Sequence, residues 1–359
     1  MDLETRMELI SSVGEEILTQ EELKQLLETN DHPVAYDGFE PSGIAHLPFG
    51  ILRAANISTL LKAGVKFKLF LADYFALINN KMGGDLEKIK TAGKYFIEVW
   101  KACGVDTDKV EIVWASEIMD NLEYWDRVIR IGREVTLNRS MRATSIMGRT
   151  QGELQSTAQL FYPIMQTNDI FHLKVDICQM GMDQRRANIL GREVAPKLGS
   201  KKPVAIHHHM IISLQGAGVS SSNDPEEIML SSKMSKSKPE TCLYMHDSEE
   251  DLKRKIGKAY CPERVIEGNP IIDYCEHLIF KKYDTMMIER PAKFGGNLEI
   301  QSIAELKKVY DEGKLHPMDL KNATSKYLNE MIAPAREHFE KDKKAKELYE
   351  TVKQYAITR

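Results

Sequence analysis

One stretch of this chain combines a glycine-containing turn with a histidine at the start of a predicted helix. It reads Tyr36-Asp-Gly-Phe-Glu-Pro-Ser-Gly-Ile-Ala-His46-Leu-Pro-Phe-Gly50. Residues 34–37 predict a short buried strand, and apolar residues at helical spacing from Leu47 predict the helix. A helix N-terminus offers free N–H groups and partial positive charge, and glycine lets a phosphate approach the backbone. On this stretch alone, an ordinary strand–turn–helix connection explains the pattern equally well.

A second stretch, Lys233-Met-Ser-Lys-Ser237, lies in a long loop at 212–240 that is rich in Ser, Gly and Lys. Loops of this length inside compact domains are usually functional or disordered. Two lysines three residues apart, beside hydroxyl groups, can wrap a polyphosphate and neutralise the charge on a leaving pyrophosphate. An isolated pair of loop lysines is usually just solvated, but the complete five-residue string is far more specific than its charges.

A third group of polar residues shares one face of a helix expected at 157–173. Tyr162, Gln166 and Asp169 stand at positions i, i+4 and i+7. A phenol, an amide and a carboxylate are too polar for a core unless a ligand or a polar network fills the space between them. Both explanations remain open from spacing alone.

The elements that must position these groups alternate between strand and helix. Such alternation predicts a parallel α/β sheet with right-handed crossovers. Strands are expected at 34–37, 66–73, 110–114, 175–181 and 204–207, and helices at 85–103, 121–134, 157–173 and 184–198. Residues 1–31 are expected to form a helical lead-in without chemistry of its own. The unpatterned residues 136–156 are expected to form an insertion. After a boundary near 240, helices are expected near 249–260, 270–280, 302–312 and 319–340.

Composition limits the class of protein. With 42% hydrophobic and 28% charged residues among 359, the chain is an ordinary globular protein. A net charge of −4 means that any nucleic-acid contact must come from local patches. The cysteines are scattered without a CxxC pair, which predicts reduced thiols: Cys103, Cys178, Cys242, Cys261 and Cys275. No apolar run reaches membrane-spanning length, and the acidic N-terminus is no secretory or transit peptide, so we expect a cytoplasmic protein.

Taken together, these stretches resemble a known family. His46-Leu-Pro-Phe49 is similar to the HIGH signature, and Lys233 to Ser237 matches the KMSKS signature, of class I aminoacyl-tRNA synthetases. With Tyr36–Gly43, Tyr162–Asp169 and Val175–Arg185, the chain resembles the tyrosyl-tRNA synthetases of archaea and eukaryotes. The resemblance covers nearly the whole chain, including Phe294-Gly-Gly and His316–Asn322. The departure is Phe49, where the HIGH signature has its second histidine.

The resemblance implies a Rossmann-type catalytic domain at 32–240 and a mainly helical anticodon-binding domain at 241–359. The implied reaction activates L-tyrosine with ATP to tyrosyl-adenylate and pyrophosphate, and then transfers tyrosine to the 3′ end of its tRNA. Tyr162, Gln166 and Gln184 are expected to hold the α-amino group of tyrosine. Tyr36 and Asp169 are expected to pair with its phenolic hydroxyl, so that phenylalanine would leave both unpaired.

For the ATP end, the resemblance implies catalytic roles for His46, Lys233 and Lys236. Magnesium is expected to arrive on the ATP phosphates. His207-His-His209 cannot all face one ion, and no protein-bound zinc is expected. The expected ATP-binding residues are Gly38, Phe39, Glu40, Ser42, Gly43, His46, Phe49, Asp183, Met210, Ile211, Lys233, Met234, Ser235, Lys236 and Ser237.

For tRNA, Phe294 and Asp319 match positions that read the first anticodon base in archaeal relatives. An exposed ring can stack on an unpaired base, and a carboxylate can accept from a guanine edge. Arg and Lys residues near 139–149 and 253–258 are candidates for phosphate contacts. A homodimer is expected, through the region 136–160. The alternatives are a tryptophanyl-tRNA synthetase, which Tyr36 and Asp169 argue against, a non-catalytic tRNA- or partner-binding relative, and an unrelated nucleotidyltransferase.

Overall fold

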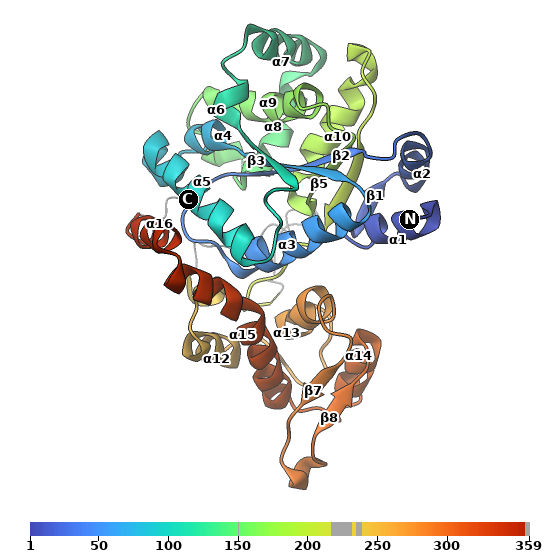
Figure 1. Ribbon diagram of the computed structural model, residues 1–359, viewed down its shortest axis with the longest axis vertical. Helices are drawn as coiled ribbons and strands as arrows, with labels where there is room; N and C mark the ends of the chain where they lie inside the picture. The colour runs from blue at the N-terminus through green and yellow to red at the C-terminus, as the bar shows by residue number, and fades with distance from the viewer. Residues whose placement is uncertain (150, 217–231, 235–238, 356–359) are drawn as a thin grey trace.

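The computed structural model describes residues 1–149, 151–216, 232–234 and 239–355 (Figure 1). Its centre is a six-stranded sheet in the order β1-β6-β5-β2-β3-β4. Five strands are parallel, which confirms the α/β prediction: β2 Val34–Phe39, β3 Lys66–Leu71, β4 Val110–Trp114, β5 Ile177–Gly181 and β6 Val204–His208.

The strand order places a crevice at the centre of the sheet. From β2 the chain moves outward to β3 and β4, then returns to the other side of β2 for β5 and β6. This is the arrangement of a doubly wound Rossmann-type sheet, in which the connections reverse direction between β2 and β5. Ligands of such sheets bind outside the carboxyl ends of the strands at that point. The carboxyl ends of β2 and β5 are therefore the expected site.

Helices cover both faces of the sheet (Figure 1). Successive side chains of β3 alternate, so that Phe67 and Leu69 join one apolar cluster while Phe70 joins the other. The first cluster includes α3 Leu47–Lys62 and α5 Leu86–Ala102, and the second includes α7 Leu122–Glu134, α9 Ala158–His172 and α10 Arg185–Val194. Shorter helices are α1 Leu3–Ser11, α2 Gln20–Thr29, α4 Asp73–Ile78, α6 Ala115–Ile118 and α8 Leu137–Ala143.

Two segments differ from the sequence-based expectation. Residues 1–31 contain not only helices but also β1 Glu16–Leu18, which runs antiparallel to β6 and forms the edge of the sheet. Residues 136–156 are not wholly irregular, because they hold α8 and two 3-10 turns, Thr144–Met147 and Gln151–Glu153. The strand β1, the helix α8 and the two 3-10 turns are each too short to leave a periodic pattern in the sequence.

The C-terminal region is mainly helical, as predicted, and carries a small hairpin. The helices are α12 Glu249–Gly257, α13 Pro270–Tyr274 with a π-helical turn Cys275–Ile279, α14 Ile303–Asp311, α15 Pro317–Lys341 and α16 Lys343–Lys353. The hairpin joins β7 Met286–Ile288 to β8 Leu298–Ile300 and points away from the main sheet (Figure 1). In contrast, α16 packs back onto α5. Among the described helices, none combines the length and the apolar character that a membrane crossing requires.

Candidate active site

A cavity of about 650 Å³ lies at the carboxyl ends of β2 and β5. Most residues expected at the site line it together: Tyr36, Gly38, Phe39, Glu40, Ser42, His46, Phe49, Tyr162, Gln166, Asp169, Asp183, Gln184, Met210, Ile211, Lys233 and Met234. Gly43 is not part of the lining. Ser235, Lys236 and Ser237 lie outside the described residues. The sheet therefore brings together groups from segments far apart in the sequence.

Two polar atoms in the cavity wall lack hydrogen-bond partners in the described structure. The side chains of Tyr36 and Asp169 are almost fully buried, and both the Tyr36 hydroxyl and Asp169 Oδ2 are unpartnered. The other oxygen, Asp169 Oδ1, accepts from the Tyr124 hydroxyl at 2.8 Å. Burial raises the pKa of the Asp169 carboxyl well above its usual range, although the Tyr124 hydrogen bond opposes this. Such atoms are costly unless a ligand pairs with them.

A second set of polar side chains has protein partners. The Tyr162 hydroxyl donates to Glu40 Oε1 at 2.6 Å, and Glu40 also accepts from Asn79 Nδ2. Gln166 Nε2 donates to Gln184 Oε1 at 3.1 Å, and Gln184 Nε2 donates to the Ile146 carbonyl. The face predicted at 162–169 is thus partly a satisfied network, with the unsatisfied carboxylate oxygen of Asp169 at its end.

His46 caps the N-terminus of α3. Its Nδ1 accepts from the Phe49 backbone N–H at 3.2 Å, so the neutral ring carries its proton on Nε2. The preceding turn contains Gly43 with a φ of +93°, a left-handed conformation that favours glycine. The backbone N–H groups of Leu47 and Phe49 are already used within the protein, and Pro48 has none. What this end of the cavity offers an anion is the His46 side chain, which lines it, and the positive end of the α3 dipole.

Phe49 packs against other aromatic rings. Its ring centre lies 4.2 Å from that of Phe96, 4.9 Å from that of Trp100 and 5.3 Å from that of Phe39. The side chain lines the cavity but belongs to the apolar core beneath it. The departure from the HIGH signature therefore exchanges a polar ring for packing between β2, α3 and α5.

Lys233, the first residue of the KMSKS string, lines the cavity and contacts Asp183. Its Nζ forms an ion pair with Asp183 Oδ2 at 2.8 Å. Burial would raise the pKa of Asp183, but the neighbouring ammonium outweighs it and keeps the pKa below its usual value. Backbone hydrogen bonds from Ser213 N to Ser232 O and from Met234 N to Ile211 O hold Lys233 in place.

Sequence reasoning missed Arg53 and Asp37, which line the cavity, and Tyr124, which does not line it but holds Asp169. Arg53 on α3 pairs with Asp37 Oδ2 at 2.5 Å and lies 3.0 Å from His208 Nδ1. Burial raises the pKa of Asp37 to about 6, even though Arg53 opposes the shift. The signal for Arg53 was a charged residue inside an apolar helix. Tyr124, which orients Asp169, gave no signal because it reads as an ordinary core residue of its helix.

The three adjacent histidines point to different partners. His207 Nδ1 lies 2.8 Å from Glu16 Oε2, His208 Nδ1 lies 2.8 Å from Gln179 Nε2, and His209 Nε2 lies 2.7 Å from Asp273 Oδ1. His209, Asp273 and His277 bring three potential metal-ligand atoms near one another, one from each residue. However, the rings of His209 and His277 are stacked 3.8 Å apart at 12°, so their in-plane lone pairs cannot converge on one ion. The contacts form an ion-pair network instead.

The residues expected to read tRNA lie in the C-terminal region and not in the cavity. Phe294 ends a 3-10 turn between β7 and β8 and is 60% exposed, with Lys293 Nζ 4.8 Å from its ring. Asp319 lies in the first turn of α15. Arg290 ties the hairpin to the approach to α15 through a hydrogen bond to the Lys314 carbonyl. Because it is exposed, the Phe294 ring is available to a partner.

Comparisons with known proteins agree with this geometry. A family model described as class I tRNA synthetases for W and Y matches residues 28–333. A tyrosine–tRNA ligase of Thermococcus kodakarensis is 47% identical over 98% of this chain and 99% of its own length. Cytoplasmic tyrosine–tRNA ligase 1 of Arabidopsis thaliana is 42% identical over 100% of this chain and 90% of its own length.

Solved structures give the same result. The tyrosyl-tRNA synthetase of Pyrococcus horikoshii, solved with L-tyrosine, has a TM-score of 0.91 at 43% identity, covering 98% of this chain and 100% of that one. A parasite tRNA synthetase at 18% identity and a TM-score of 0.67 shares the fold. The chain belongs to the class I aminoacyl-tRNA synthetases, in the family of the tryptophan and tyrosine enzymes.

Proposed function

We propose that the chain is a tyrosine–tRNA ligase, which activates L-tyrosine with ATP and transfers it to the 3′ end of tyrosine tRNA. The observation that carries this proposal is the unpartnered pair, the Tyr36 hydroxyl and Asp169 Oδ2, in the cavity wall. A phenolic hydroxyl can donate to the carboxylate and accept from Tyr36 at once. Phenylalanine would leave both unpaired, and the indole N–H of tryptophan can only donate.

The polar network beside this pair suits the α-amino group of the substrate. Because Tyr162 gives its proton to Glu40, its oxygen can only accept from a further group. Gln166 likewise uses its Nε2 on Gln184, which leaves Oε1 as the acceptor of its amide. Acceptors at Tyr162 and Gln166, with Gln184 holding the amide in place, favour an ammonium. These contacts support the proposal that Tyr162, Gln166 and Gln184 hold the amino end of tyrosine.

The other end of the cavity suits ATP. The turn from Gly38 to Gly43 and the N-terminus of α3 would face the phosphates, Asp183 the ribose, and the backbone at Met210 and Ile211 the adenine. Magnesium would arrive on the phosphate oxygens and screen their charge. His46, Lys233 and the positive end of the α3 dipole would supply the positive charge and donors that the phosphates require.

No side chain needs to act as a nucleophile. A carboxylate oxygen of tyrosine attacks the α-phosphorus, and the bond to pyrophosphate breaks. His46 and Lys233, together with Lys236 outside the described residues, would stabilise the charge that develops on the phosphates. Lys233 pairs with Asp183 here, so bound ATP would share or replace that ion pair.

We further propose a homodimer through the expected region 136–160, which holds α8 and the start of α9, and we extend this interface to the preceding helix α7. Leu122 and Ile129, two turns apart on α7, are 84% and 64% exposed, and Leu137 of α8 is 63% exposed. Exposed apolar residues on packed neighbouring helices favour a second copy of the chain as the partner. A Leu122→Glu/Ile129→Glu variant that sediments like the parent would contradict this interface.

The remaining partners follow from the same proposal. The hairpin ring of Phe294 and the carboxylate of Asp319 would read the anticodon of tyrosine tRNA. A relative in Arabidopsis thaliana is named as cytoplasmic, and we place this enzyme in the cytoplasm on that likeness. A non-catalytic descendant would have had no need to keep the unpartnered pair, which is costly without a substrate.

The test is ATP–pyrophosphate exchange with magnesium and without tRNA, run in parallel with tyrosine, phenylalanine and tryptophan. We expect exchange with tyrosine alone. Exchange with tryptophan would favour the tryptophanyl alternative, and no exchange by folded protein would favour a non-catalytic relative. Lys233→Ala should slow adenylate formation far more than it weakens tyrosine binding, whereas equal losses would refute its catalytic role.

A further inference from the structure

We propose that Lys255, on α12 in the C-terminal region, is a positioning residue for His46 in the adenylation step. It acts through residues 242–247, which we call the anchor segment. The inference rests on the proposed function, because it assigns His46 to the phosphates of ATP. Lys255 does not line the cavity and would touch no substrate.

The anchor segment grips the chain on both sides of His46. Leu47 N donates to the Leu243 carbonyl at 2.7 Å, and Met245 N donates to the Ala45 carbonyl at 3.1 Å. The first of these bonds satisfies an N–H at the start of α3 that has no partner within the helix. The orientation of the His46 backbone is therefore set from outside its own turn.

Side-chain packing reinforces this grip. Gly50, one turn along α3, faces the anchor segment so closely that an added Cβ would overlap Met245 Sδ. The Tyr95 hydroxyl accepts from the Ala45 N–H at 3.1 Å and lies 2.8 Å from His246 Nε2. A shift of the anchor segment would therefore move residues 45–50 as well.

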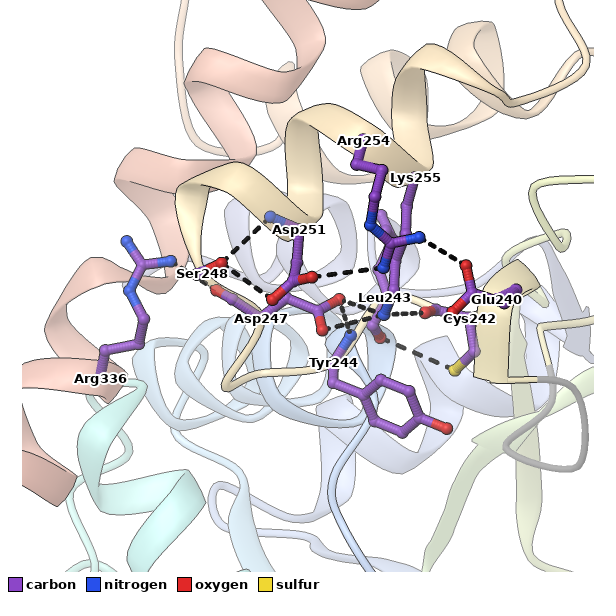
Figure 2. A network of polar contacts seen from close by, with 10 residues as sticks. All are labelled: Glu240, Cys242, Leu243, Tyr244, Asp247, Ser248, Asp251, Arg254, Lys255 and Arg336. Atoms are coloured by element: carbon purple, nitrogen blue, oxygen red, sulfur yellow. Dashed lines mark hydrogen bonds and ion pairs between the residues drawn. The ribbon is translucent and has the colours of Figure 1, made fainter.

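Lys255 holds the anchor segment at both ends (Figure 2). Its Nζ donates to the Cys242 carbonyl at 3.0 Å and to Asp247 Oδ1 and Oδ2 at 2.9 and 2.8 Å. Asp247 Oδ2 also accepts from the Tyr244 N–H at 2.9 Å, and the Tyr244 ring lies 4.8 Å from the ammonium. One ammonium thus closes residues 242–247 into a loop of fixed shape.

This ion pair is buried and has a second support. Lys255 is 6% exposed and Asp247 is 9% exposed. Arg336 of α15 donates to the Asp247 carbonyl at 2.7 Å, as Figure 2 shows. The sequence had grouped Lys255 with candidates for phosphate contacts, but its burial excludes that role. This buried ion pair fixes the shape of the anchor segment, since neither charge can move away without leaving the other buried and unpaired.

Loss of the Lys255 contacts should affect the ATP end of the site and not the tyrosine end. The anchor segment contacts the phosphate end of the site, whereas Tyr36 and Asp169 lie on β2 and α9. Misplacing a charge-stabilising group by about 1 Å can cost on the order of 100-fold in rate. Loss of the Lys255 contacts should therefore lower kcat and raise the KM for ATP, with the KM for tyrosine within twofold of the parent.

The test compares Lys255→Met, Lys255→Arg, and the double variant Asp247→Asn/Lys255→Met. The single change to Met leaves a buried unpaired carboxylate and should lower Tm. The double variant removes both charges and should recover part of that Tm, because no charge is left unpaired. Lys253→Met is the matched control, since Lys253 is an exposed lysine of the same helix.

Exchange kinetics supply the first measurement. We expect the folded double variant to show a kcat for ATP–pyrophosphate exchange about 10- to 100-fold below the parent. Lys255→Arg should restore part of the loss, and Lys253→Met should match the parent. A double variant with parental kcat, or one whose tyrosine KM rises as much as its kcat falls, would overturn the proposal.

Amide hydrogen exchange supplies a readout that needs no activity. The N–H of Leu47 should lose protection in the double variant and keep it in Lys253→Met, because the Leu243 carbonyl is its partner. Unchanged protection of the Leu47 N–H would refute the positioning role, whatever the ATP–pyrophosphate exchange assay shows. Absence of tyrosine-dependent ATP–pyrophosphate exchange in the folded parent would refute the proposed function, and it would leave the hydrogen-exchange result to be judged by itself.

Discussion

A buried hydroxyl without a partner lowers the stability of the free protein, and Tyr36 carries such a hydroxyl in the wall of the cavity. Asp169 adds an unpartnered carboxylate oxygen, although its other oxygen is held by Tyr124. In the proposed function, the partner of both atoms is the phenolic hydroxyl of the substrate tyrosine. At the scale of single residues, the proposed selectivity would therefore come from two buried polar atoms that only a hydroxyl-bearing substrate can satisfy together.

Tyr36→Phe tests this reasoning. The substitution removes no hydrogen bond of the free protein, so Tm should stay the same or rise. The KM for tyrosine in ATP–pyrophosphate exchange should rise about 5- to 30-fold, which corresponds to about 1–2 kcal/mol for one hydrogen bond. Tyr95→Phe is the control, because the Tyr95 hydroxyl has two partners and its loss should lower Tm. A clear fall in the Tm of Tyr36→Phe would argue against an unpartnered hydroxyl.

Phe49→His would restore the second histidine of the HIGH signature. Because Phe49 packs against Phe96 and Trp100, the polar ring should destabilise the protein by about 2–3 kcal/mol. We expect no gain in the rate of exchange. Urea unfolding gives the loss, and Phe49→Leu should cost less because it stays apolar. A faster enzyme of parental stability would show that the aromatic packing has no such importance.

At the scale of elements, His209 joins three parts of the chain. It follows β6, its Nε2 lies 2.7 Å from Asp273 Oδ1 of α13, and its Nδ1 lies 3.3 Å from Glu15 Oε2, just before β1. Burial alone would lower the pKa of His209, but the two carboxylates outweigh it and raise the pKa to about 9. The protonated ring is thus a clasp between the N-terminal segment, the sheet and the C-terminal region.

The clasp predicts a pH dependence of stability. Since folding raises this pKa above its unfolded value near 6.5, the stabilisation is complete below about pH 6.5 and is lost as pH rises through about 9. After allowance for partial exposure we expect about 1–2 kcal/mol. Urea unfolding between pH 6.5 and 9.5 should show this decline in the parent and a flatter profile in His209→Gln. Equal slopes in both proteins would contradict the clasp.

The elements also show what the sequence could and could not predict. The parallel strands and the long helices were predictable because each carries its own apolar pattern. The strand β1 was not, because its three residues gain meaning only when they pair with β6. Tyr162, Gln166 and Asp169 could be grouped by helical spacing, whereas Arg53 and Tyr124 join the site only through tertiary packing. The roles of β1, Arg53 and Tyr124 depend on contacts with residues far away in the sequence, and local sequence patterns do not report such contacts.

At the scale of the whole molecule, the two expected binding regions are separate. The cavity lies in the main sheet, and Phe294 lies on a hairpin that points away from it (Figure 1). In the proposed function, one chain would therefore carry its acceptor-end site and its anticodon site at different ends. This separation allows their contributions to be measured independently.

Phe294→Ala exploits the separation. The ring is 60% exposed, so its removal should leave Tm unchanged while raising the KM for tRNA in aminoacylation. Loss of one stacked base contact of about 1–3 kcal/mol corresponds to a rise of about 5- to 100-fold. The same preparation should keep its ATP–pyrophosphate exchange. Met287→Ala, on the exposed side of β7, is the matched control. A parental KM for tRNA would remove Phe294 from the anticodon contacts.

The placement of the two ends of the chain has a consequence for biosynthesis. β1 hydrogen-bonds to β6, and α16 packs on α5, so the catalytic sheet is completed by segments near both ends of the sequence. Contacts of such large sequence separation slow folding, because long loops must close before they form. On the ribosome, the edge strand β1 would wait for β6 to emerge, and α5 would stay uncovered until α16 has been synthesised. The nascent chain should therefore depend on chaperones until α16 has emerged and covers α5.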